Sequence, residues 1–145
     1  MAERRIINPW NWQDRYGFVQ ANEIGNINKI LICSGQTAID AEGKAAYPDN
    51  IGDQLKMALD NLEEVLRKAD FSLSDIVRMT IYTTDMNKLI SAYEPTVIRL
   101  SHAKCRPAMT LLEVSRLAFS ELMVEIEATA IPYYSLILYQ SGSFV

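Results

Sequence analysis

Hydrophobic positions recur along the chain with two different periods, and each period predicts its own kind of element. From residue 51 to residue 69, apolar residues return every three or four positions, while charged residues occupy the opposite face. This pattern is typical of an amphipathic helix that packs on a sheet. Either Asp49 or Asn50 can cap its start. The apolar face consists of Ile51, Leu55, Ala58, Leu59, Leu62, Val65, Leu66 and Ala69.

Alternation with a period of two predicts the strands, most regularly at residues 76–83 and 122–131. Further strands are predicted at residues 18–23, 30–39 and 108–114. Gly35 interrupts the second of these, which is typical of a bulge or of a close approach by another part of the chain. Three residues, Val77, Met79 and Ile81, are expected to share one strand face, and Met123, Glu125, Glu127 and Thr129 to share another, more polar one.

A second helix is predicted after Asp85, which can cap it, with an apolar face that runs from Met86 to Leu100. Pro95 removes a backbone donor inside this helix and predicts a kink or a restart. The element order is therefore β-β-α-β-α-β-β, with room for one more strand near the start. Two helices cannot cover both faces of such a sheet. We expect an α+β fold whose mixed sheet of about five to six strands carries two helices on one face, while neighbouring copies cover the other.

Composition narrows the classes of function. The 145 residues, of which 49% are hydrophobic and 22% charged, fit one globular domain. The net charge of −4 and the lack of a strongly basic stretch argue against nucleic-acid binding. No apolar run approaches the ~20 residues of a membrane span, and no signal-peptide core is present, so we expect a cytoplasmic protein. Two cysteines and one histidine offer no zinc set, and no cofactor is expected.

Six short segments occur in an order and at a spacing that resemble a known family. They are Tyr16-Gly17-Phe18-Val19-Gln20, Ile32-Cys33-Ser34-Gly35-Gln36, Asp60-Asn61-Leu62, Asp75-Ile76-Val77, Arg106-Pro107-Ala108 and Val124-Glu125-Ile126-Glu127-Ala128. Together they resemble the RidA/YjgF family of reactive-intermediate deaminases, also described as L-PSP endoribonuclease-like proteins. The resemblance covers about residues 10–131. It predicts one RidA-like domain over residues 1–132 and leaves residues 133–145 as an extension of unknown role.

The resemblance implies a chorismate-mutase-like fold, a homotrimer, and small-molecule sites in the clefts between subunits. It also implies hydrolysis of enamine or imine acids to keto acids and ammonia. By the same resemblance, Glu125 takes the position of a glutamate that holds water, while Ser34 and Phe18 line the cleft. Phe18 stands where many members have tyrosine.

The position of the family's carboxylate-binding arginine is occupied by Met109. An arginine offers a carboxylate two parallel charge-assisted hydrogen bonds, whereas methionine offers neither charge nor donor. Arg106 and Arg116 lie an odd number of residues away and do not replace it by simple strand geometry. With Leu111 on the same strand face, the cleft is expected to be more apolar than in the family. Plain subunit packing is the alternative interpretation of these apolar residues.

Three functions are therefore compared. The first is a RidA-like deaminase with altered substrate choice or weak activity, in which Glu125 is catalytic and Ser34, Phe18, Met109 and Leu111 bind the ligand. The second is a non-catalytic protein that binds a small metabolite in the same inter-subunit cleft. The third, a ribonuclease, is disfavoured by the acidic balance and the single histidine. Ser34 has no adjacent base and is interpreted as a hydrogen-bond donor, not as a nucleophile.

Overall fold

A computed structural model of the protein describes residues 2–133. Its main sheet has the order β3-β6-β4-β5, formed by β3 (Leu31–Gln36), β6 (Val124–Ala130), β4 (Ile76–Thr83) and β5 (Ala108–Glu113). The first two pairings are antiparallel, and β4 and β5 are parallel, so the sheet is mixed as expected. The α+β class is confirmed.

The first two strands form a sheet of their own, which corrects the expectation of a single sheet of five to six strands. β1 (Glu3–Ile7) pairs with β2 (Ala21–Gly25) in an antiparallel hairpin. β2 begins three residues later than predicted because residues 14–16 form a 3-10 turn that Gly17 ends at φ 80°. Phe18 therefore lies in a connecting segment, and Val19 forms a single bridge to Ala108 of the main sheet.

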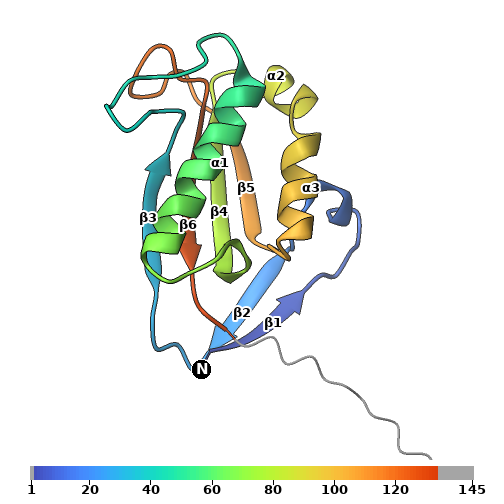
Figure 1. Cartoon of the computed structure of the whole chain (residues 1–145). Coiled ribbons are helices and arrows are strands. Elements are labelled where there is room, and N and C mark those ends of the chain that lie inside the picture. The colour runs from blue at the N-terminus through green and yellow to red at the C-terminus, as the bar shows by residue number, and fades with distance from the viewer. Residues whose placement is uncertain (1, 134–145) are drawn as a thin grey trace, which may run out of the picture.

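Three helices lie on one face of the main sheet (Figure 1). α1 (Ile51–Lys68) follows β3, while α2 (Met86–Ser91) and α3 (Glu94–His102) form the crossover that parallel β4 and β5 require. The predicted restart is confirmed, because the helix is interrupted between α2 and α3. Pro95 lies in the first turn of α3, where its missing N–H costs little. The caps are confirmed too: Asn50 accepts from the Asp53 N–H, and Asp85 from the Lys88 N–H.

The core lies between these helices and the sheet. The four leucines of α1 that form the centre of its apolar face, Leu55, Leu59, Leu62 and Leu66, are at most 1% exposed. Met79 and Ile81 of β4 meet them, but Val77 does not. A bulge between Ile76 and Arg78 places two residues of β4 opposite one of β6, which reverses the alternation. Val77 therefore packs with Ala2 and Ile131 in a separate small cluster.

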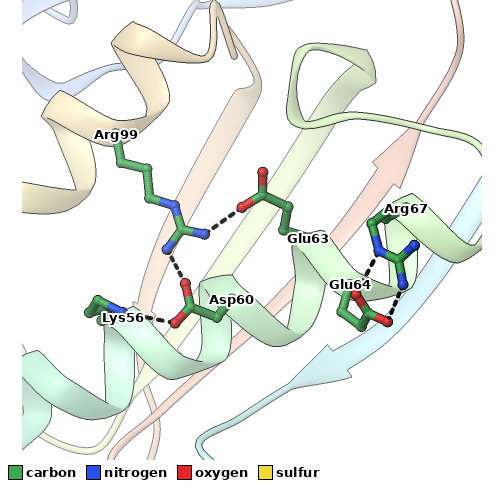
Figure 2. Close-up of polar contacts among 6 residues, drawn as sticks. All are labelled: Lys56, Asp60, Glu63, Glu64, Arg67 and Arg99. Carbon is green, nitrogen blue, oxygen red and sulfur yellow. Dashed lines mark hydrogen bonds and ion pairs between the residues drawn. The ribbon is translucent and has the colours of Figure 1, made fainter.

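An ion-pair network joins α3 to α1 (Figure 2). The Arg99 guanidinium contacts Asp60 Oδ1 through Nη1 and Glu63 Oε2 through Nη2, both at 2.5 Å, and Lys56 Nζ lies 3.0 Å from Asp60 Oδ2. Burial would raise the pKa of Asp60, but hydrogen bonds from Lys56 and Arg99 outweigh it and lower that pKa. Because partly exposed pairs contribute only about 0–1 kcal/mol each, we interpret the network as orienting α3 against α1.

The other face of the main sheet carries a mixture of polar and apolar side chains. Arg78 Nη2 donates to Thr110 Oγ1 at 2.6 Å, and the Tyr82 hydroxyl donates to Glu127 Oε1 at 2.6 Å. Ile32 on the same face is 79% exposed. Within residues 2–133 no helix lies over this face. Nor is any helix of that part of the chain long and apolar enough to cross a bilayer.

Candidate functional site

A pocket of about 690 Å³ lies between α3, the edge strand β5 and the segment that precedes β2. Figure 1 shows this segment, in blue, passing beside α3. Phe18, Met109 and Leu111 all line the pocket, so three of the five predicted site residues come together. The full lining consists of Trp12, Arg15, Tyr16, Phe18, Ile90, Tyr93, Glu94, Val97, Ile98, Met109 and Leu111.

Aromatic side chains build the wall opposite α3. The left-handed Gly17 turns the chain so that Phe18 faces Trp12, edge to face, with ring centroids 5.8 Å apart. Trp12 also meets Tyr16 in an edge contact at 6.4 Å. Trp12 remains 52% exposed even though it packs on two rings. Such half-exposed aromatic groups are typical of surfaces that cover a ligand or a partner.

The floor of the pocket is apolar and uncharged. The Tyr93 hydroxyl donates to the Met109 sulfur at 3.1 Å, which fixes the thioether in place. Tyr93 is 8% exposed, and burial, with a smaller contribution from Cys105, raises its pKa to about 12. Tyr93 therefore stays a neutral donor at physiological pH. Met109 and Leu111 thus lie in an apolar part of the pocket, and a cleft more apolar than in the family stays a prediction.

Glu125 and Ser34 lie elsewhere, on the face of the sheet that the helices leave open. Between Cys33 and Gln36, β3 advances three residues while β6 advances two, so the predicted irregularity at Gly35 is confirmed as a bulge. The Glu125 side chain lies against this glycine: a Cβ built on Gly35 would fall 1.8 Å from Glu125 Oε1. The bulge therefore seats the carboxylate on the backbone next to the exposed Ser34.

Within one chain, the predicted site residues thus form two half-sites. Met109 pairs with Met79 of β4, and β4 in turn separates β5 from β6. Adjacent strands lie about 4.8 Å apart, so Met109 and Glu125 are separated by roughly 10 Å across the strands. Met79 also pairs with Ala128, three residues from Glu125, which adds about 10 Å along the strands, and the two side chains point to opposite faces. Intrachain geometry does not bring the apolar pocket and the carboxylate together.

Met123 was expected on the face of Glu125, and this prediction is wrong. The residue precedes β6 and packs against the main core, and its N–H donates to the buried Gln54 side chain at 2.8 Å. The two arginines considered as substitutes, Arg106 and Arg116, are exposed and lie outside the pocket.

The sequence interpretation missed Trp12, Arg15, Tyr16 and Glu94, which all line the pocket. The dense aromatic run Trp10-Asn11-Trp12 shortly before Gly17 was the available signal. The Arg15 guanidinium carbon lies 4.8 Å from the centroid of the Tyr16 ring. Among residues 2–133, no cluster of three histidine, cysteine or acidic side chains is arranged to hold a metal.

Comparison with known proteins gives a consistent result. A family model described as Endoribonuclease L-PSP matches residues 14–132. A RutC family protein of Pyrococcus horikoshii is 34% identical over 78% of this chain and 85% of its own length. The 2-iminobutanoate/2-iminopropanoate deaminase of Escherichia coli K12 is 29% identical over 79% of this chain and 86% of its own length.

Solved structures agree with these sequence relatives. A Rid-family protein from Yersinia pestis superposes with a TM-score of 0.81 at 31% identity, over 89% of this chain and 98% of that one. The YjgF gene product of Escherichia coli superposes with a TM-score of 0.65 at 25% identity, over 80% of this chain and 88% of that one. The fold and these matches define a small α+β protein of the Endoribonuclease L-PSP class. The chain belongs to the RidA/YjgF family.

Proposed function

We propose that this protein hydrolyses enamine or imine acids to keto acids and ammonia, with Glu125 as the general base that positions the attacking water and accepts its proton. The observation that carries the proposal is the seat of Glu125 on the Gly35 bulge beside Ser34, which holds a carboxylate at a fixed position on an otherwise open face. The deaminase name of the Escherichia coli relative supports the same reaction.

The chemistry needs one general base that later returns a proton. An enamine first tautomerises to the imine. Water then adds to the C=N carbon while the carboxylate accepts its proton and passes it to the nitrogen, which gives a carbinolamine. The carboxylate next takes the hydroxyl proton of the carbinolamine and passes it to the nitrogen, so that ammonia leaves as the C=O bond forms. No electrons are exchanged with any co-reactant. Ser34 is placed to donate a hydrogen bond to the substrate, since it neighbours the seat of Glu125 and no base lies beside it in sequence.

A homotrimer is part of the same proposal. Assembly would cover the open sheet face with neighbouring copies and would offer a way to bring the apolar pocket of one copy near the carboxylate of another. Light scattering is expected to give three times the 16.4 kDa chain mass. A species with the mass of a single chain at micromolar concentration would contradict this arrangement.

Glu125→Gln is expected to slow ammonia release from an oxidase-generated imino acid by about 10- to 100-fold, because the amide still binds water but no longer accepts its proton. Glu127→Gln is the matched control: it lies on the same strand face two residues away and contacts Tyr82. Rates are measured above the uncatalysed baseline. Equal rates for wild type and Glu125→Gln would rule out Glu125 as the general base.

A non-catalytic binding protein is the second candidate, and one observation favours it. Met109, fixed by Tyr93, leaves the floor of the pocket without a charged donor for a short acid. In this alternative, ligand binding persists while the rate stays at the uncatalysed baseline in both wild type and Glu125→Gln. We expect 2-aminoacrylate to be a poor substrate in either case.

A further inference from the structure

We propose that Arg15 supplies the carboxylate-binding group that position 109 lacks, and that the pocket selects acids with a large apolar or aromatic body. The carboxylate would lie on Arg15 at the mouth, and the body would lie against Trp12, Phe18 and Met109. If the proposed deaminase function holds, the substrates are imines of amino acids with bulky apolar side chains. This choice of substrate rests on the proposed function, whereas the binding mode does not.

Charge is the first argument. Arg15 is the single cationic residue among the described residues that line the pocket, and Glu94 is the single acidic one. Arg15 makes no ion pair and no side-chain hydrogen bond within residues 2–133, whereas Arg4, Arg5, Arg67, Arg78 and Arg99 all do. Its guanidinium lies over the Tyr16 ring, which orients it and leaves its N–H groups for an anion. The planar fork suits a carboxylate.

The size and polarity of the pocket are the second argument. Its volume of about 690 Å³ falls within the range of sites that hold drug-sized molecules and far exceeds what a three- or four-carbon acid fills. Two isoleucines at its rim, Ile90 and Ile98, are 60% and 49% exposed. A ligand with an apolar body would remove this surface from water, and a short acid would not.

The Tyr93–Met109 contact is the third argument, because it decides where the anion lies. A carboxylate placed at the floor would meet a thioether and a phenol whose hydrogen is already donated to Met109 Sδ. It would be desolvated there without an ionic partner, which is costly. At the mouth, the carboxylate meets Arg15 and keeps part of its hydration. The floor is then left to the apolar body.

Calorimetric titration of the full-length protein with stable, unreactive acids tests the proposal. The probes are 3-phenylpropionate, its uncharged amide 3-phenylpropionamide, and butyrate. We expect the wild type to bind 3-phenylpropionate at least about tenfold more tightly than butyrate. Arg15→Gln should weaken 3-phenylpropionate binding by about 10- to 100-fold and leave the amide within about twofold, because only the charge-assisted hydrogen bonds are lost. Arg15→Lys should fall between them, since it keeps the charge and loses the fork.

The control is Arg116→Gln, which removes an exposed arginine outside the pocket and should leave all three affinities unchanged. The proposal is overturned if Arg15→Gln weakens acid and amide alike, or neither, or if the wild type binds butyrate as tightly as 3-phenylpropionate. No turnover is measured, so an inactive protein that binds 3-phenylpropionate through Arg15 refutes only the proposed hydrolysis. Conversely, 3-phenylpropionate binding that is insensitive to Arg15→Gln refutes only this inference, and Glu125-dependent hydrolysis in the separate rate assay would still support the proposed function.

Discussion

Gln54→Leu is expected to lower the free energy of unfolding by about 3 kcal/mol, although it replaces a polar helix residue by a better-packing apolar one. Gln54 is fully buried, and its amide connects α1 to two loops. Nε2 donates to the carbonyls of Ala46, Tyr47 and Glu121 at 3.2, 3.2 and 2.7 Å, and Oε1 accepts the Met123 N–H at 2.8 Å. Leucine leaves the Ala46 and Glu121 carbonyls and the Met123 N–H without these partners, at about 1–3 kcal/mol for each that stays buried, whereas the Tyr47 carbonyl keeps the Asn50 N–H.

Chemical denaturation measures the loss, with Lys56→Leu on the exposed side of α1 as the control, since its ion pair with Asp60 contributes at most about 0.5 kcal/mol. Gln54→Glu gives an independent check. Its carboxylate faces three carbonyl oxygens and should be disfavoured in the ionised form, so this variant should become more stable as pH falls and the carboxyl is protonated. A Gln54→Leu loss no larger than the Lys56→Leu loss would show that water replaces the lost partners.

Local patterns predicted most of the elements because each depends on neighbours along the chain. The apolar stripe predicted for α1 and the alternation predicted for β6 both match the buried faces in the structure, since each element packs one face against a single core. The position of Val77 was not predictable from alternation, because the bulge at Ile76/Arg78 is specified by pairing with β6. The separate hairpin likewise depends on the turn that ends at Gly17, where the sequence shows only a glycine after an aromatic residue.

The site was predictable only in part, for the same reason. Strand parity correctly placed Met109 and Leu111 on one face and Glu125 on a polar face. Alternation within single strands could not show that these two faces lie on opposite sides of the sheet, because their relation depends on the order and register of the strands. Arg15 was missed since it lies in a single 3-10 turn, residues 14–16, which no hydrophobic period marks in the sequence.

Gly35→Ala is expected to slow hydrolysis by about 10- to 100-fold, as much as Glu125→Gln does, while leaving the thermal melt almost unchanged. The added Cβ would lie 1.8 Å from Glu125 Oε1 and 2.6 Å from its carboxyl carbon, so the carboxylate has to leave its seat. The side chain is flexible and can swing away at little cost. Alanine is also favoured over glycine in a strand by about 0.5–1 kcal/mol, which offsets part of that cost.

Gly25→Ala is the matched control, because a Cβ at that strand glycine meets nothing within 4 Å. The informative comparison is the double variant with Glu125→Gln. If Gly35 acts only by seating the carboxylate, the two changes remove the same interaction, and the double variant should be no slower than the slower single variant by more than about twofold. Rate losses that multiply would mean that Gly35 serves the reaction by another route, such as close approach of the substrate to the β3 backbone. A Gly35→Ala protein as fast as wild type would mean that the position of Glu125 in this seat is irrelevant to turnover.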